Sequence, residues 1–217
     1  WAVADVCDAI WPYDPDTLEP SGTGALTRFL WSWRTQLSIR VAYGLTQLGR
    51  GQSWYEYSMF FRNRFRSPFL ITFPEVATHN HFALMTGGTL FRQTAPIIKL
   101  VNGASKGQHL PLLGLLNSSV ACFWMRQVCH DKGGGGIGGG IAAETWERFF
   151  AFNGTKLKRL PLPADRPVDS AEQLHKLARS LEERTPETLL RCQDGDCTMR
   201  RLTDARREQD SIHQSMI

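Results

Sequence analysis

Seven of the eight positions from Gly133 to Gly140 are glycine, and this run fixes where regular structure must stop. Glycine loses more backbone freedom on folding than any other residue, which costs roughly 0.5–1 kcal/mol relative to alanine inside a helix or strand. The run is therefore expected to be a loop, and it ends the most apolar helix candidate, over residues 108–130. With Lys132 at its entrance, a loop of bare amides suits phosphate contact, and a flexible tether is the equal alternative.

The first 53 residues are expected to be a helical segment. Apolar residues from Leu26 to Leu48 recur at steps of three and four, which predicts one continuous helix closed by Gly49. The chain opens on Trp1 rather than methionine, so we expect that further residues once preceded it. We take residues 1–53 as the N-terminal segment.

Residues 54–163 combine aromatic and β-branched residues with turn signals, which is typical of strands joined by hairpins. The alternation in FLITF and HFALM, the TGG turn at 86–88 and the apolar run Ile97–Val101 mark these strands and turns. The helix over residues 108–130 is apolar on most faces and is expected to be buried. The segment therefore predicts the strand-rich main domain of an α+β fold.

A helical hairpin is expected in residues 164–217, as an appendage to the main domain. Ser170 precedes Gln173 by three residues, which is the spacing of a capping box that starts a helix. A second helix is expected from about Met199, where apolar residues recur at near-heptad intervals.

Positive charge is concentrated in the middle of the chain. Residues 28–163 carry sixteen basic and five acidic side chains, a net charge of +11, although the whole chain carries only +4. Such a surplus indicates a polyanionic partner, because lysine and arginine release the counterions condensed on nucleic acid. A solvated basic face without a partner is the alternative.

Several enzyme and site classes lack their signatures in this sequence. No Gly-Lys-Ser/Thr follows the glycine run, and a helix rather than a strand precedes it, which excludes a P-loop and a dinucleotide fingerprint. Neither GxSxG nor HExxH occurs. Five cysteines, with Cys192 and Cys197 as the one short-spaced pair, favour reduced thiols over zinc or disulfides. No apolar stretch approaches the ~20 residues of a membrane span, and we expect a cytoplasmic protein.

Residues suited to nucleic-acid recognition gather in the strings RNRFR and THNH. An extended segment would present Arg62, Arg64 and Arg66 on one face, and guanidinium groups suit phosphate and the O6/N7 edge of guanine. Asn80 is suited to bidentate contact with adenine, while an ordinary hydrogen-bonded strand end is the equal alternative for THNH. The further residues expected to contribute are Thr78, His79, His81, Arg92, Lys99, Lys106 and Lys132.

Three strings of the sequence resemble one family. VATHNHFALMTGGTLFRQTAPIIKL, LLGLLNSSVACFWMRQVCHDKGGG and FNGTKLKRLPLP occur in the order found in the C-terminal specificity region of the PglX-type adenine-specific DNA methyltransferases of BREX phage-exclusion systems. More distantly, the strings are similar to the target-recognition domains of TaqI-like and Eco57I-like methyltransferases and of type I specificity subunits. The resemblance runs from roughly Trp54 to Pro163 and implies a DNA target-recognition domain.

The same resemblance implies duplex DNA as the partner. It adds Asn117, Ser118, Gly133 and Gly134 to the expected DNA-binding residues, because they match the family's LNS helix and KGG loop. It also implies S-adenosylmethionine as cofactor of the parent enzyme.

The catalytic motif of this family, Asn/Asp/Ser-Pro-Pro-aromatic, does not occur in the sequence, and neither does its FxGxG-type cofactor loop. We therefore expect no catalytic residue and no bound cofactor within these residues. The alternative function is a helical scaffold that binds partner subunits of a phage-defence complex.

Overall fold

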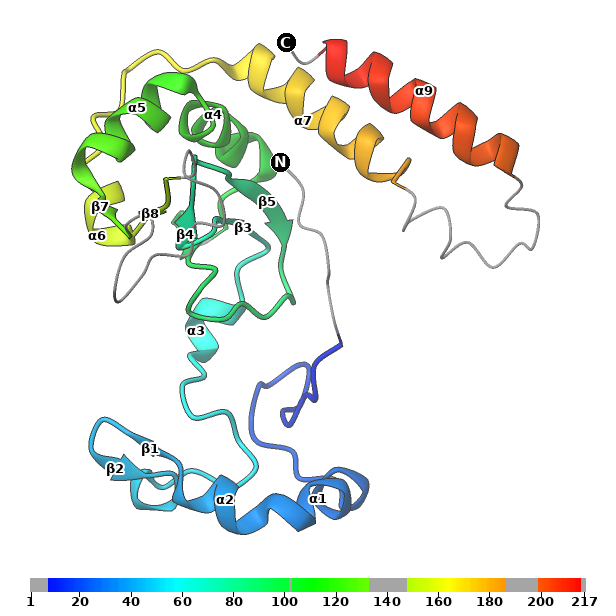
Figure 1. Ribbon diagram of the computed structural model, residues 1–217. Coiled ribbons are helices and arrows are strands. Elements are labelled where there is room, and N and C mark those ends of the chain that lie inside the picture. The colour runs from blue at the N-terminus through cyan, green and yellow to red at the C-terminus, as the bar shows by residue number, and fades with distance from the viewer. Residues whose placement is uncertain (1–7, 102, 133–147, 186–198, 216–217) are drawn as a thin grey trace. The chain divides into compact units, whose positions relative to one another are not determined.

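The computed structural model describes residues 8–101, 103–132, 148–185 and 199–215, which belong to two compact units (Figure 1). The N-terminal unit ends at Arg66 and the C-terminal unit begins at Ser67. The division expected between residues 53 and 54 thus falls inside the N-terminal unit. Helices and several antiparallel sheets together confirm the α+β class.

The N-terminal unit contains short helices where one continuous helix was expected. Helix α1 spans Gly24–Leu30, a 3-10 turn η1 spans Trp31–Trp33 and helix α2 spans Arg34–Ile39. Two short strands follow, β1 (Val41–Ala42) and β2 (Leu45–Thr46), which pair as an antiparallel hairpin. A second 3-10 turn, η2, and the short helix α3 complete the unit; they span Leu48–Arg50 and Arg62–Phe65.

Two residues with positive φ explain why the prediction of a helix up to Leu48 was wrong. Tyr43 has φ 55° and Gly44 has φ 79°, and a type I′ hairpin turn needs positive φ at both central positions. The spacing of apolar residues by three and four continues through this turn, so the spacing does not indicate that the helix ends before it. The expected stripe is also not a buried core. Its residues Leu26, Leu30 and Leu37 are only partly buried, and the others are exposed: Trp33, Val41, Leu45 and Leu48.

Side chains that donate to backbone carbonyls hold the hairpin against the loop over residues 53–58. Gln47 is fully buried, and its Nε2 donates to the carbonyls of Ser53 and Glu56 at 3.2 and 3.0 Å. Arg40 Nη2 donates to the carbonyls of Trp54 and Glu56 at 3.0 and 2.7 Å. These bonds satisfy buried carbonyls that have no partner in a strand ladder.

The central sheet of the C-terminal unit follows the expected strands. β3 (Phe69–Thr72) lies between β5 (Ala83–Thr86) and β6 (Ile97–Ile98), and both neighbours are antiparallel to it. Gly87, just after β5, donates its amide to the Pro68 carbonyl at 2.8 Å. A Cβ at this position would stand 2.3 Å from the Ser67 carbonyl oxygen, so only glycine fits there.

A second, smaller sheet joins the two sides of the glycine run. β8 (Phe150–Ala151) lies between β4 (Val76–Ala77) and β7 (His130–Asp131), again with antiparallel neighbours. The Lys132 amide extends the pairing by donating to the Phe149 carbonyl at 2.8 Å. The strands on the two sides of residues 133–147 therefore belong to the same sheet.

Two helices occupy the range in which one buried helix was expected. α4 (Lys106–Leu116) packs on β3 and β5, and its leucines form the core with Ile71, Phe73 and Phe82. α5 (Ser119–Val128) buries Ala121 and Met125 and exposes the opposite side. The prediction of burial is thus confirmed for α4 and wrong for half of α5.

Helices α6 (Gly154–Leu157), α7 (Val168–Glu182) and α9 (Met199–Ser215) complete the C-terminal unit. α7 packs along α4 and so belongs to the same unit as the sheets. The prediction that Ser170 starts this helix was wrong, because α7 begins at Val168 with no side-chain cap. The last two helices, α7 and α9, are in contact, and just beyond the end of α7 the Arg184 carbonyl accepts a hydrogen bond from Gln209 Nε2 of α9 at 2.7 Å. Among the described helices, none combines the length and apolarity needed to cross a membrane.

Candidate functional site

The junction between α4 and α5 is fixed by two asparagine side chains. Asn117 Oδ1 accepts the Phe82 amide at 2.8 Å, and Asn117 Nδ2 donates to the Phe82 carbonyl at 2.9 Å. Asn80 Nδ2 donates to the carbonyls of Leu116 and Ser118. The side chain of Asn117 therefore pairs with the backbone just before β5 as a neighbouring strand would, and the helix direction changes at this point.

Helix α5 starts at this junction with a side-chain cap. Ser118 has extended backbone angles, and its Oγ accepts the Ala121 amide at 3.1 Å, which satisfies a donor at the helix N-terminus. The helix is amphipathic: Ala121 and Met125 are buried, while the residues one turn apart on the other side are exposed to solvent. The exposed residues of α5 are Ser119, Val120, Phe123, Arg126 and Gln127.

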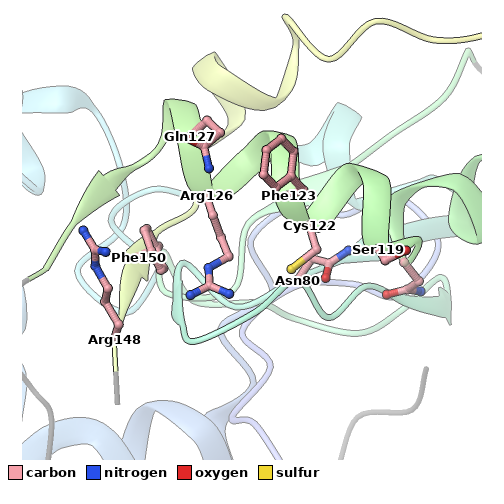
Figure 2. Close-up of a pocket in the computed structure, with 9 residues that line it drawn as sticks. Asn80, Ser119, Cys122, Phe123, Arg126, Gln127, Arg148 and Phe150 are labelled. Atoms are coloured by element: carbon pink, nitrogen blue, oxygen red, sulfur yellow. The ribbon is translucent and has the colours of Figure 1, made fainter. Parts of the chain in front are cut away.

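Two arginines meet over one aromatic ring beside α5. The Cζ of Arg126 lies 5.0 Å from the centroid of the Phe150 ring, and the Cζ of Arg148 lies 5.5 Å from the same centroid. Figure 2 shows the ring between the two side chains. Guanidinium groups are attracted to the negative faces of aromatic rings, which holds both in place. Arg148 Nε also donates to Asp131 Oδ2 at 2.5 Å.

These side chains line a cavity of about 560 Å³, which Figure 2 shows in close-up. One end carries the two arginines and the other end carries Asn80 and Ser119. No carboxylate belongs to the described lining, although Asp131 pairs with Arg148 behind it. The cavity is therefore a polar, positively charged hollow, lined by Asn80, Asn117, Ser119, Cys122, Phe123, Arg126, Gln127, Arg148 and Phe150.

Burial raises the pKa of the nearby Cys129 thiol, and a hydrogen bond with the backbone of Asn153 only partly offsets this effect. A buried neutral thiol is a poor nucleophile. In the described part of the chain, no group of three or more His, Cys, Asp or Glu residues is placed to hold a metal ion. The described lining of the cavity itself supplies side-chain amides and two guanidinium groups, which can bind a ligand through hydrogen bonds and charge.

The structure brings some of the residues expected from the sequence to this cavity. Asn80 and Asn117 line it, and Ser118 lies at the same junction. Lys132 is exposed one residue beyond β7. Thr78 and His79 precede Asn80, and the Thr78 hydroxyl is 2.9 Å from His79 Nδ1. His81 is exposed on the other side of Asn80, and Gly133 and Gly134 lie outside the described residues.

The remaining expected residues lie elsewhere. The extended RNRFR segment was predicted wrongly, because Arg62–Phe65 is the helix α3 of the N-terminal unit, so alternate positions do not share a face. Arg62 pairs with Glu19 at 2.5 Å, and Arg66 Nη2 donates to the Thr17 carbonyl at 3.0 Å. Arg64 is in the same helix. Arg92 is exposed in a turn after β5, and Lys106 is exposed at the start of α4.

The sequence contained a signal for the cavity that was not used. Phe123 lies four residues after Ser119, and Arg126 and Gln127 lie three and four residues after Phe123. This spacing places the four residues on one helix face. The signal is lost when residues 108–130 are taken as one helix that is apolar all round. Arg148 carries no comparable signal, because only the pairing of β7 with β8 brings it to α5.

Comparison with known proteins relates the chain to a methyltransferase. No family model matches the sequence. Over 190 residues, the chain is 38% identical to the adenine-specific methyltransferase PglX of Streptomyces coelicolor. The aligned segment covers 85% of this chain but only 16% of the Streptomyces protein. The similarity therefore concerns nearly the whole chain and a small part of a much longer methyltransferase.

Proposed function

We propose that the chain is the DNA target-recognition part of an S-adenosylmethionine-dependent, adenine-specific DNA methyltransferase in a BREX-type phage-defence system. The observation that carries this proposal is the 38% identity to the Streptomyces methyltransferase along 85% of the chain. The net charge of +11 over residues 28–163 supports a DNA partner. The cavity with two arginines and no carboxylate in its described lining supports it too.

In this proposal the chain selects the sequence, and the rest of the enzyme transfers the methyl group. A methyltransferase must take its target base out of the duplex stack, so it needs a separate surface that holds the surrounding duplex. S-adenosylmethionine and the catalytic residues are assigned to the part of the enzyme outside this chain. The residues proposed to contact DNA are Arg62, Arg64, Arg66, Thr78, His79, Asn80, His81, Arg92, Lys106, Asn117, Ser118, Lys132, Gly133 and Gly134.

Fluorescence anisotropy of the chain with a labelled random-sequence duplex tests the DNA-binding part of the proposal. If about six phosphate contacts form, raising the salt concentration from about 50 to 200 mM should weaken binding about a thousandfold. An affinity that is the same at both salt concentrations would contradict a phosphate-binding surface. Titration calorimetry with S-adenosylmethionine tests the division of labour, and micromolar binding to this chain alone would overturn it.

A second candidate function is a protein-interaction scaffold, which the exposed apolar side chains of the N-terminal unit favour. Phe29 and Trp33 are 60% and 51% exposed, and their ring centroids lie 5.8 Å apart; Val41 on the following hairpin is 65% exposed. Exposed apolar side chains that gather on one surface are typical of sites that contact another protein. The Streptomyces protein extends far beyond the aligned segment. We therefore propose that the partner is the methyltransferase part of such a longer polypeptide.

Co-expression of this chain with the unaligned part of the Streptomyces methyltransferase tests the second candidate. The two are expected to co-purify, and a Phe29→Ser, Trp33→Ser variant is expected to lose the partner. Val120→Ser removes an apolar residue that is 73% exposed in the other unit and serves as the control. Equal recovery of the partner by both variants would argue against the N-terminal surface.

A further inference from the structure

We propose that the arginine end of the cavity binds a backbone phosphate of duplex DNA, and that Gln127 beside it reads a base edge. The inference rests on the proposed DNA-binding function and gives it a specific place in the fold. None of Arg126, Gln127 and Arg148 was among the residues expected from the sequence to bind DNA. The two arginines come together because both guanidinium groups lie over the ring of Phe150 in β8.

The two guanidinium groups leave positive charge without a matching carboxylate. In the described part of the chain, Arg126 forms no ion pair, and Arg148 pairs with Asp131 through Nε alone. Counted over the described residues alone, two positive charges and one negative charge give a net charge of +1 at this end. A phosphodiester carries one negative charge, and arginine's planar donor fork matches phosphate oxygens.

The two arginines are also held in position before any ligand arrives. Phe150 is only 3% exposed and is paired in the middle of a three-stranded sheet, opposite Ala77 and Asp131. Its ring therefore gives Arg126 and Arg148 a fixed support. Side chains that are already ordered lose less conformational entropy when they bind, which favours affinity. The support by the Phe150 ring distinguishes Arg126 and Arg148 from arginines whose side chains extend freely into solvent.

Gln127 follows Arg126 directly on the exposed face of α5 and lines the same cavity. A glutamine amide has a donor and an acceptor that match N6 and N7 of adenine in the major groove. The groove is about 12 Å wide and admits an α-helix, and α5 at ten residues is about 15 Å long. A phosphate bound at Arg126 thus places base edges within reach of the neighbouring amide.

The experiment compares single variants of the full chain on two duplexes. One duplex is selected from a randomised library with the unaltered chain, and the other is an unrelated sequence of equal length. Arg126→Ala and Arg148→Ala should weaken binding to both duplexes alike and reduce the slope of log affinity against log salt by about 1 each. Gln127→Ala should weaken binding to the selected duplex by roughly 5- to 150-fold and leave the unrelated duplex nearly unchanged.

Arg159→Ala is the matched control, because Arg159 is exposed and lies outside the cavity lining. A series of selected duplexes with single neutral methylphosphonate linkages then identifies the phosphate. The unaltered chain and Arg159→Ala should lose affinity at every contacted linkage, and Arg126→Ala should be insensitive to one of these linkages while it stays sensitive to the others. Circular dichroism melting confirms that each variant is folded.

The outcomes separate this inference from the function on which it rests. If the unaltered chain shows no salt-dependent binding to any duplex, the proposed function fails. If it binds but Arg126→Ala and Arg148→Ala behave like Arg159→Ala, the cavity is not the phosphate site and the proposed function stands. If Gln127→Ala weakens both duplexes equally, its role in base reading is overturned.

Discussion

Gly114 of α4 lies so close to Ala171 of α7 that a Cβ on Gly114 would stand 2.6 Å from the Ala171 Cβ. Two Cβ atoms in a folded protein do not approach to this distance, and the methyl side chain of Ala171 cannot rotate out of the way. The absence of a side chain at Gly114 is therefore what allows α7 to lie along α4.

We expect Gly114→Val to lower the free energy of unfolding by about 1–3 kcal/mol, because the added carbons must push the two helices apart. Gly107→Val in the same helix is the control, since a Cβ there meets only the Ser105 hydroxyl oxygen at 3.8 Å. The control should change stability by no more than about 0.5 kcal/mol. Urea denaturation measures both, and equal effects would show that the helix contact is not tight.

Asn117→Ala should destabilise the C-terminal unit, because it leaves the Phe82 amide and carbonyl without their side-chain partner. Phe82 is 1% exposed, and a buried polar group without a partner costs about 1–3 kcal/mol. Ser119→Ala, at the exposed end of the same cavity, is the control and should have little effect on stability. Thermal melting distinguishes them. An Asn117→Ala protein of full stability and reduced DNA affinity would instead favour direct DNA contact by Asn117.

The stability of the C-terminal unit should fall as the pH drops below 6.5, because of His175. Burial lowers the pKa of His175 from 6.5, and the positive charges of Lys106 and Arg179 lower it further, while Glu182 opposes them. The unfolded chain therefore binds a proton more readily than the folded chain, so folding is favoured above pH 6.5 and disfavoured as protonation proceeds. His175→Leu should flatten this part of the pH profile in urea denaturation. An unchanged slope would assign the pH dependence to other groups.

Tyr13 should make the stability of the N-terminal unit fall as the pH rises, which is the opposite of the effect expected for His175. Burial raises the pKa of Tyr13 from 10.0 to about 12, and its hydroxyl oxygen accepts the Tyr57 amide at 3.0 Å. The folded state retains the phenolic proton longer than the unfolded state, so stability should fall between pH 10 and 12. Tyr13→Phe should reduce this fall and lower stability near neutral pH by about 0.5–1.5 kcal/mol. Ultraviolet titration of the phenol checks the shift, and ionisation of every tyrosine near pH 10 would contradict it.

Local patterns predicted the parts of the fold that depend on local interactions. The alternation in FLITF and HFALM predicted β3 and β5, and the apolar composition of residues 108–130 predicted a buried helix, of which α4 is the buried part. The break between α4 and α5 depends instead on Asn117 bonds to Phe82, which is 35 positions earlier in the chain. Hydrophobic spacing contains no information about such a bond, so the two helices were taken as one.

The same limit applies to the candidate site. Asn80 was selected for its hydrogen-bonding groups and Asn117 for its match to the LNS string of the family. The structure shows the side-chain amides of both engaged with backbone partners. Their role in DNA binding stays a prediction. Arg126 and Arg148 were not selected, because they are separated by the glycine run and meet only through the pairing of β7 with β8. A site assembled by tertiary pairing has no fixed spacing in the sequence.

The division of α5 into a buried and an exposed side has a consequence for protein engineering. Ala121 and Met125 anchor the helix in the core, whereas Ser119, Phe123 and Gln127 contribute to none of the buried core. Randomising those three positions should therefore yield variants that nearly all fold. A combinatorial collection built in this way would sample new surface chemistries on one unchanging scaffold, with the Asn117–Ser118 junction holding the helix at a constant angle throughout.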